Sequence, residues 1–351
     1  MIKFIPHIFL SILLSLSGVS ADSLSIIAVG DIMMGSDYPE NCLPPNQGKE
    51  LFRDAASIIK TADISLGNLE GTLLLDGICT KKIAKGRTYA FRTPPDFAQN
   101  LADAGFDFMN LANNHMNDFG QEGITSTITT LTNVDLKYGG SNGTFGKFEI
   151  RGSNIAIVCF AFSPQTYTIL EIEKAQQIVA EQARQSDIVI VSFHGGGEGA
   201  KYIHTSDTIE YFMDAPRGNV VKFTHAVIDS GADFVWGHGP HVPRALEIYK
   251  DRLIAYSLGN FCTWGFNIAE ERGYAPVLKL VLDSLGTFKH GAIIPFIQKS
   301  YRSLEFDKDA NAIRLIKKLS SDDFPNSAPE ITDDGIVRPR NVITGESILN
   351  E

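Results

Sequence analysis

Two histidines, His238 and His241, lie in the segment "VWGHGPHVPRALEIY", directly after an apolar run that predicts a strand. Glycine and proline surround them, and glycine gives the backbone the freedom to turn sharply. Paired imidazoles with so little bulk between them suit a metal ion, although such histidines can equally be satisfied loop residues. The pair raises the question of whether other metal-ligating side chains gather at the same place.

Polar side chains also follow four other predicted strands, at the point where each strand ends. They are Asp31 in "GDIMMG", Glu70 in "GNLEGT", Asn113, Asn114, His115 and Asp118 in "NLANNHMNDFG", and His194 and Glu198 in "VSFHGGGEG". Each alone has a plainer explanation as a turn former or loop residue. Ligands bind at the carboxyl edge of α/β sheets, however, and carboxylate, amide and imidazole together suit Mn, Fe or Zn. The five strand ends together predict a metal site.

Apolar runs alternate with segments of helical spacing through most of the chain. Strands are predicted at 23–31, 63–70, 106–115, 153–162, 187–196 and 232–239, and helices at 48–62, 94–105, 121–133, 169–186 and 218–231. This order predicts an α/β fold with at least partly parallel sheets. Consecutive strands are then predicted at 244–261, 276–284 and 291–300, followed by an amphipathic helix at 308–321.

The chain begins "MIKFIPHIFLSILLSLSGVSADS", which predicts a secretory signal peptide over residues 1–21, cut after Ala21. The alternative is an uncut membrane anchor, although the apolar run is short for a spanning helix. We therefore expect a secreted or periplasmic protein, with a main domain over 22–300 and a more polar C-terminal extension over 301–351.

Charge and cysteine content narrow the function classes further. The formal net charge of −10 argues against a nucleic-acid-binding protein, which would usually carry a basic face. Cys159 and Cys262 lie in apolar, strand-like segments and are expected to be buried. Cys42 and Cys79 lie in polar segments and are the better disulfide candidates in an oxidising compartment, although sequence does not determine connectivity.

The order of these motifs resembles the CapA family of capsule, or poly-γ-glutamate, biosynthesis proteins. The motifs are GD, NLE, ANNHxxDxG, HxGxE, GHxPHV and "IAYSLGNF", and they extend over about residues 25–261. The fold of that family is similar to that of calcineurin-like metallophosphoesterases. The resemblance therefore implies a four-layer α/β/β/α sandwich of two mixed sheets. It also implies an anionic polymer or phosphoester substrate, and capsule synthesis or export machinery as partners.

The resemblance also implies roles for individual residues. Two divalent cations, Mn, Fe or Zn, would activate a water, and Glu70 stands where the related enzymes have a bridging carboxylate. His115 would protonate the leaving group, with Asp118 orienting its ring. The implied metal ligands are Asp31, Glu70, Asn114, His194, His238 and His241.

Three positions depart from the pattern of the related proteins. Met33 stands where the enzymes usually have a histidine, which would leave the Asp31 site one ligand short. Gly195 and Gly239 stand where many CapA-like sequences have tryptophan and histidine, and we expect the smaller residues to open the pocket.

Four polar residues near the motifs have two interpretations each. Arg244 and Lys201 could contact an anionic substrate, but solvated surface positions are the more common place for such residues. Glu198 is either a partner of His194 or an exposed loop acid. Asn260 either turns a strand or supports a histidine ligand.

The sequence leaves three functions open. The first is an exported metal-dependent hydrolase of phosphoesterase type. The second is a polymer-binding or assembly protein without turnover, which the missing first-motif histidine favours. The third is hydrolysis of γ-glutamyl amide bonds, because metal-activated water also attacks carbonyls. Fold alone does not choose among them.

Overall fold

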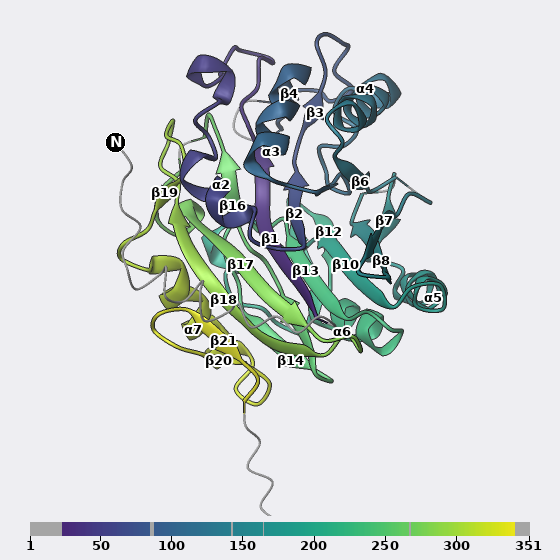
Figure 1. Cartoon of the computed structure of the whole chain (residues 1–351). Helices are drawn as coiled ribbons and strands as arrows, with labels where there is room; N and C mark the ends of the chain where they lie inside the picture. The colour runs from purple at the N-terminus through teal and green to yellow at the C-terminus, as the bar shows by residue number, and fades with distance from the viewer. Residues whose placement is uncertain (1–22, 85–87, 142, 164, 267, 341–351) are drawn as a thin grey trace, which may run out of the picture.

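The computed structural model describes residues 23–84, 88–141, 143–163, 165–266 and 268–340, so the predicted signal peptide lies outside the described residues. Two mixed β-sheets stack face to face, and helices cover their outer faces (Figure 1). This is the four-layer α/β/β/α sandwich that the sequence predicted, and the predicted fold class is confirmed.

The first sheet has the strand order β20-β21-β18-β17-β1-β2-β5-β6, with β16 paired to β1 and β19 paired to β18. The parallel strands β1, β2, β5 and β6 end at the same edge of the sheet, and β17 and β18 extend it in the antiparallel sense. The strands are β1 Leu24–Met33, β2 Ile64–Leu69, β5 Phe108–Asn110, β6 Lys137–Gly139, β16 Asn260–Thr263, β17 Tyr274–Leu282, β18 Phe288–Ile297, β19 Glu305–Phe306, β20 Glu330–Ile331 and β21 Ile336–Arg338.

The second sheet has the order β14-β15-β13-β10-β8-β7, with β9 paired to β8. Strands β8, β10, β13 and β15 are parallel, so their carboxyl ends also share one edge. The strands are β7 Gly146–Ile150, β8 Ser153–Ala161, β9 Tyr167–Thr168, β10 Ile188–His194, β13 Phe234–His238, β14 Leu246–Tyr249 and β15 Arg252–Ala255. Two small ribbons pair β3 Thr72–Leu73 with β4 Arg92–Thr93, and β11 Glu210–Phe212 with β12 Ala215–Gly218.

The helices fall where the sequence predicted them. They are α2 Arg53–Ile59, α3 Ala98–Ala104 and α4 Gly120–Asn133 against the first sheet, α5 Ile172–Ala183 and α6 Val220–Asp229 against the second, and α7 Asn311–Asp323, which contacts β14, β17 and β18. Short 3-10 turns are η1 Pro45–Gly48, η2 Pro95–Phe97, η3 Ala200–Tyr202 and η4 Glu270–Gly273. Among the described residues, no helix combines the length and apolarity that a membrane crossing requires.

Apolar side chains fill the space between the sheets and under both helical layers. All ten residues of β1 are buried, as expected for a strand covered on both faces. Ile26 of β1 and Trp236 of β13 belong to the cluster between the sheets, and the indole N–H of Trp236 donates to the carbonyl of Val29 (2.9 Å). This packed core fixes the two sets of strand ends relative to each other.

The segment after residue 244 adds strands rather than βα units, as predicted. The predicted strands appear as β14 to β18, and the predicted helix at 308–321 appears as α7. Beyond residue 300, β19 and β21 hydrogen-bond to β18. The domain boundary at residue 300 stays a prediction.

The predicted disulfide between Cys42 and Cys79 is wrong, because both thiols are free. Each thiol lies against a different neighbour: the Cys79 Sγ is 3.4 Å from the Lys81 carbonyl oxygen, and the Cys42 Sγ packs against Gly265. Cys159 and Cys262 are buried, as predicted.

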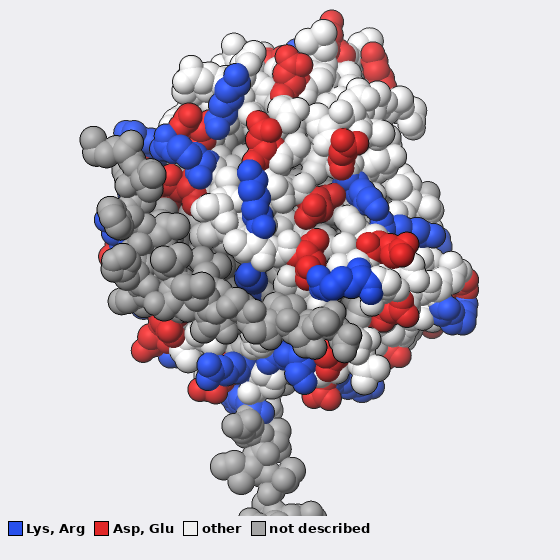
Figure 2. Space-filling model, viewed as in Figure 1, with Lys and Arg blue, Asp and Glu red and all other residues white. Residues whose placement is uncertain are grey.

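Acidic and basic side chains are intermingled on the face of the molecule shown in Figure 2. The formal charge of −10 is therefore not gathered into one acidic area on that face.

Candidate metal centre

Strand register places the polar strand ends of both sheets at one location. In the first sheet, Asp31 pairs with Asn68, and Asn68 pairs with Asn110. In the second sheet, His194 of β10 pairs with His238 of β13. Parallel pairing puts each row at the carboxyl edge of its sheet, so the two rows face each other across the sandwich.

The backbone beside Asp31 is shaped by the "YSLGNF" segment. The register of β1 with β16 shifts between Asp31 and Ile32, and the Asp31 N–H donates to the Gly259 carbonyl (2.9 Å). A Cβ on Gly30 would lie 1.9 Å from that carbonyl oxygen, so only glycine allows this approach. Asn260 donates from Nδ2 to the His241 carbonyl (3.2 Å). This contact agrees with the interpretation that Asn260 supports a histidine ligand.

His241 lies on a turn with an unusual backbone conformation. Its φ is 58° and that of Gly239 is 111°, so a histidine occupies the left-handed region that favours glycine. Such conformations persist where surrounding structure holds them, and they gather at functional sites. The turn brings the His241 Nδ1 to 2.9 Å from the Asp31 Oδ2.

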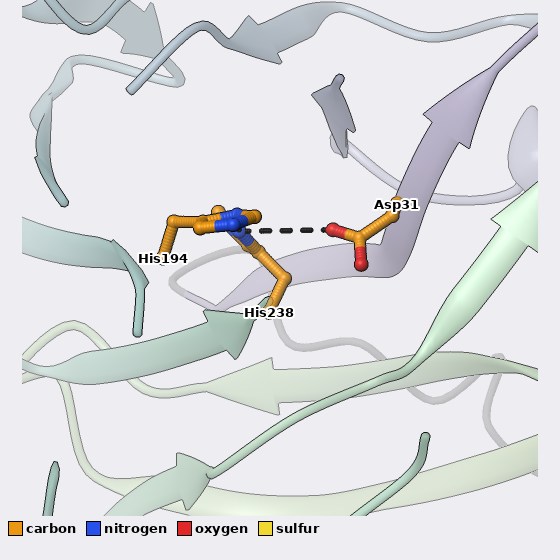
Figure 3. Close-up of side chains that lie close together, drawn as sticks. All are labelled: Asp31, His194 and His238. Carbon is orange, nitrogen blue, oxygen red and sulfur yellow. Dashed lines mark hydrogen bonds and ion pairs between the residues drawn. The ribbon is translucent and has the colours of Figure 1, made fainter. Parts of the chain in front are cut away.

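Two groups of side chains could each hold a metal ion. In one, ligand atoms of Asp31, His194 and His238 lie within 4.8 Å of one another, and in the other those of Asp31, Glu70 and His241 do. Figure 3 shows the Asp31 carboxylate of β1 facing the two imidazoles that come from β10 and β13. Asp31 belongs to both groups.

Glu70 also reaches toward both groups. Its Oε1 lies 3.8 Å from the His194 Nε2, and its Oε2 lies 3.7 Å from the His241 Nδ1. The structure therefore gathers Asp31, Glu70 and three histidines, from four separate segments, around one small volume.

Several buried ligand atoms in this volume have no hydrogen-bond partner among the residues that the structure describes. They include Oε1 of Glu70, Oδ1 of Asn114 and Nε2 of His194. A buried polar atom without a partner costs about 1–3 kcal/mol, so native proteins rarely leave them. Three such atoms of the right chemical types fit a site for divalent cations.

His115 lies beside this volume and is held from behind. Its Nδ1 lies 2.8 Å from the Asp118 Oδ2, and its Nε2 lies 4.0 Å from the Glu70 Oε1. Asp118 is fully buried, accepts the Phe91 N–H (2.7 Å) and pairs with the Lys81 Nζ (2.5 Å). The ring is thus oriented with Nε2 toward the metal-ligand cluster.

A second set of polar side chains holds the ligands in place, and of these the sequence analysis identified only Asn113. Asn68 donates from Nδ2 to the Asp31 Oδ1 (2.7 Å) and accepts at Oδ1 from Asn110 (2.7 Å) and Asn113 (3.1 Å). The Ser192 hydroxyl lies 2.9 Å from the His238 Nε2. Asn68 and Asn110 lie on buried strands, where an amide side chain is unusual. An asparagine within an otherwise apolar predicted strand is therefore the sequence feature that could have identified them.

Burial keeps three histidines of the site, His194, His238 and His115, in the neutral form. It lowers the pKa of His238 to about 4, takes that of His194 well below its ordinary value, and also lowers that of His115. For His194, the positive charge of nearby Arg217 adds to the effect. A neutral imidazole keeps the lone pair that a metal ligand needs.

The carboxylates respond differently to the same surroundings. Burial, reinforced by the neighbouring Asp31 and only partly opposed by His241, raises the pKa of Glu70 to about 8. Burial also acts on Asp31, but its hydrogen bond and charge interaction with His241 hold the pKa of Asp31 below its ordinary value. Despite burial, Glu70 and Asp31 raise the pKa of His241.

A pocket of about 420 Å³ opens onto the cluster. Glu70, Asn114, His115 and His241 line it. Met33 lines it as well, and its Sδ accepts the Gly35 N–H (3.2 Å), so it offers no hard ligand to the pocket.

The expectation that Gly195 and Gly239 open this pocket is wrong, because neither lines it. A Cβ on Gly195 would lie 2.3 Å from Cδ1 of Ile169, and one on Gly239 would lie 3.1 Å from the His194 ring. These glycines allow close packing behind the histidines.

Both interpretations of Arg244 are wrong, because this arginine is fully buried. It forms a two-pronged ion pair with Glu210, at 2.8 and 2.7 Å, and donates to the Gly197 carbonyl (3.1 Å).

Lys201 is exposed and does not line the pocket, which agrees with the surface interpretation. Glu198 lines the pocket and pairs with Arg217 (2.8 Å) rather than with His194.

The sequence of this chain is similar to those of capsule biosynthesis proteins. The capsule biosynthesis protein CapA of Bacillus anthracis is 28% identical over 266 residues, covering 68% of this chain and 60% of that protein. The PGA biosynthesis protein CapA of Bacillus subtilis is 29% identical over 259 residues, covering 69% of this chain and 64% of that protein. The matches thus span less than two thirds of either relative.

Among solved structures, the NAD nucleotidase of Haemophilus influenzae resembles this chain with a TM-score of 0.45 and 12% identity, covering 82% of this chain and 52% of that one. The model of the family described as bacterial capsule synthesis protein PGA_cap matches residues 25–263, which include every residue of the metal-ligand cluster. The chain belongs to this bacterial capsule synthesis protein family.

Proposed function

We propose that this chain is an exported, metal-dependent hydrolase of phosphoesterase type. It would act in the secreted or periplasmic space on an anionic polymer or phosphoester of capsule, poly-γ-glutamate or envelope polymer biosynthesis, beside the synthesis or export machinery. The observation that carries the proposal is the set of unpartnered ligand atoms on Glu70, Asn114 and His194, buried beside two groups that could each hold a cation.

The proposed metal ligands divide between two cations, Mn, Fe or Zn. His194 and His238 would hold one, Glu70 and His241 the other, and Asp31 belongs to both groups. Asn114 adds an amide oxygen at the pocket wall. When bound, such cations neutralise anionic oxygens and acidify water.

The chain's own residues would then position and protonate the substrate. The neutral His115 ring is held by Asp118 through Nδ1, which leaves Nε2 on the side of Glu70 and the pocket. The Lys81 Nζ lies 2.5 Å from the Asp118 Oδ1 and holds this carboxyl group in place behind the ring. To act as the acid, His115 would first take up a proton at Nε2, and the resulting imidazolium, stabilised by Asp118, would deliver that proton to the leaving oxygen. The buried strand ends would exclude bulk water from the reacting atoms.

The first test combines metal analysis with a substrate panel. Purified protein supplied with Mn, Fe or Zn should retain at least one metal ion per chain and hydrolyse bis(p-nitrophenyl) phosphate. The Glu70→Gln variant should lose both metal and activity. Substoichiometric metal after supply of all three ions would overturn the proposal.

A second candidate function is polymer binding without turnover on the same fold. Met33 favours it, because its sulfur is engaged by Gly35 and leaves Asp31 without the extra ligand of the related enzymes. Stoichiometric metal without hydrolysis of phosphodiesters would support this function. Release of p-nitroaniline from γ-glutamyl-p-nitroanilide would instead identify a γ-glutamyl amide hydrolase.

A further inference from the structure

Two arginines line the pocket together with the metal-ligand cluster. Arg217 comes from β12 and Arg272 from η4, and both face the same pocket as Glu70 and His241. The third cation of the pocket wall, Lys81, is already engaged by Asp118. The arginines therefore hold the positive charge that the proposed reaction does not use.

Arg217 is a buried and only partly compensated cation. The residue is 7% exposed, and its Nη2 pairs with the Glu198 Oε1 at 2.8 Å. Its Nε and Nη1 are buried, and no described residue gives either of them a hydrogen-bond partner. Its Cζ lies 3.9 Å from the centre of the Phe162 ring, which holds the guanidinium plane in place. A buried charge with unused donors is costly unless a ligand compensates it.

Arg272 is the accessible member of the pair. It is exposed, and within the described part of the chain no ion pair or hydrogen bond engages its guanidinium. Its Nη2 lies 3.3 Å from the place that a Cβ on Gly199 would take, next to Glu198. Asn260 donates to the carbonyls of both Arg272 (3.0 Å) and His241 (3.2 Å), which ties η4 to the metal-ligand turn.

The charges of the pocket wall favour an anion there. Three cations, Lys81, Arg217 and Arg272, and two carboxylates, Glu70 and Glu198, line the pocket. Any bound metal ion adds further positive charge. A free arginine beside such a wall offers a planar set of donors that matches carboxylate and phosphate oxygens.

We propose that Arg272 and Arg217 form an anion subsite beside the metal centre, which holds a carboxylate or phosphate of the substrate other than the group that reacts. Arg272 contacts the anion directly, and Arg217 supplies a fixed positive charge behind it. This inference rests on the proposed function and narrows its substrate to a chain with repeated anionic groups. One repeat unit lies at the metal centre while the next occupies the subsite.

Binding experiments test the subsite without requiring turnover. A fluorescein-labelled γ-linked glutamate oligomer and a labelled polyphosphate oligomer are titrated with the full chain in Mn²⁺ buffer, with fluorescence anisotropy as the readout. Arg272→Ala should weaken binding of at least one oligomer about tenfold, the effect of losing a charge-assisted hydrogen bond. Arg302→Ala, which removes an exposed arginine that does not line the pocket, should change the Kd less than twofold.

A glutamate oligomer with its α-carboxylates converted to amides should bind weakly and show no dependence on Arg272. Arg217→Lys, which keeps the charge, should retain tighter binding than Arg217→Met. Equal Kd values for Arg272→Ala and Arg302→Ala with both anionic oligomers would overturn the subsite. An Arg272 effect in a protein that hydrolyses nothing would leave the subsite standing and overturn only the proposed hydrolase.

Discussion

At the scale of single residues, the cluster is arranged for a cation rather than for its own stability. Burial keeps His194 and His238 neutral, so neither offsets the negative charge of Asp31. Glu70 and Asn114 present oxygen atoms that nothing in the described chain satisfies. A cation in this volume would compensate the negative charge of Asp31 and satisfy the buried oxygen atoms of Glu70 and Asn114.

The first prediction concerns Glu70→Gln in the metal-free protein. Burial raises the pKa of Glu70 to about 8, so the folded state holds its proton more tightly than the unfolded state does. That contribution to stability is complete below the ordinary value of 4.5 and is lost as pH rises through 8. Glutamine cannot ionise, so urea unfolding should show that the variant loses less stability than wild type between pH 5 and pH 8.5.

Bound metal should stabilise the wild-type protein more than the Glu70→Gln variant. At one hundred times its Kd, a bound ion stabilises the folded state by about 2.7 kcal/mol, so Mn²⁺ or Zn²⁺ should raise the Tm of the wild-type protein. The Glu70→Gln variant should show little of that rise. A wild-type Tm that no divalent cation moves would contradict the metal centre itself.

The second prediction concerns His115 and Asp118. If the proposed hydrolase acts on bis(p-nitrophenyl) phosphate, His115→Ala should lower kcat by about 10²–10⁴, the usual contribution of a general acid. Metal content should stay unchanged, because His115 lies outside both candidate ligand groups. Asp118→Asn keeps the shape and should give a smaller loss. Unchanged kcat in His115→Ala would remove that residue from the proposed role.

The sequence anticipated the cluster better than its surroundings. These ligands lie at the carboxyl ends of strands or in the turns just after them, and parallel pairing brings such positions together, so a linear pattern predicts their convergence. Lys81 comes from an irregular segment and Arg217 from the short ribbon strand β12, and the paths of both depend on tertiary packing. Arg244 was misread because its partner Glu210 is 34 residues away in a hairpin that no local pattern links to it.

At the scale of elements, the site depends on how closely two backbone segments approach. The carboxyl half of β1 touches the loop before β16, where the Asp31 N–H bonds to Gly259 and the pairing register shifts at the next residue. Glycine at position 30 is what permits this contact. The direction of the Asp31 side chain is thereby set by backbone packing rather than by its own rotamer alone.

The third prediction is that Gly30→Ala destabilises the protein by about 3 kcal/mol, because the added Cβ would lie 1.9 Å from a backbone oxygen that cannot rotate away. Gly152→Ala is the matched control. Gly152 has a φ of 83° with no atom within 4 Å of the added Cβ, so only conformational strain of about 1 kcal/mol applies. Urea unfolding of both variants gives the comparison, and equal losses would count against the close-approach argument.

Most elements follow from local pattern, and the exceptions have a physical cause. α5 and α6 match predicted helices because an apolar stripe repeats at helical spacing, and β10 and β13 match because their short apolar runs end in glycine-rich turns. The hairpin β11–β12 and the ribbon β3–β4 have no such pattern. Their few residues are held by contacts with the loops around the pocket. Such tertiary contacts cannot be predicted from the spacing of residue types in the sequence.

At the scale of the whole molecule, the two sheets must keep their facing edges in register for the site to exist. The apolar layer between them supplies most of the cohesion, but it is not directional. An ion pair between Asp63 and Arg151, here called the polar clasp, lies at the end of the sandwich opposite the metal centre, and its fixed geometry helps to align the two sheets. Asp63, just before β2 of the first sheet, binds Arg151 in the turn between β7 and β8 of the second, at 2.5 and 2.9 Å.

The last prediction concerns the pH dependence of this clasp. Burial opposes ionisation of Asp63, but its hydrogen bonds with Arg151 and Ser25 outweigh burial and lower its pKa from 3.8 to about 2. A depressed carboxyl pKa stabilises the folded state above the unfolded value, and that stability is lost as pH falls from about 4 through 2. Because the Arg151 side chain is 42% exposed and solvent screens the pair, the contribution at neutral pH should be only about 1 kcal/mol.

Asp63→Asn should therefore lower the free energy of unfolding at pH 7, measured by urea titration, and the gap from wild type should narrow as pH is brought from 5 to 3. Asp103→Asn serves as the control, because it removes an exposed carboxylate of α3 with no partner in the second sheet. A gap that stays constant over this range would show that Asp63 acts through packing alone. Because the clasp lies at the far end of the sandwich, metal content of Asp63→Asn should match that of wild type, which separates loss of sheet alignment from loss of the metal centre.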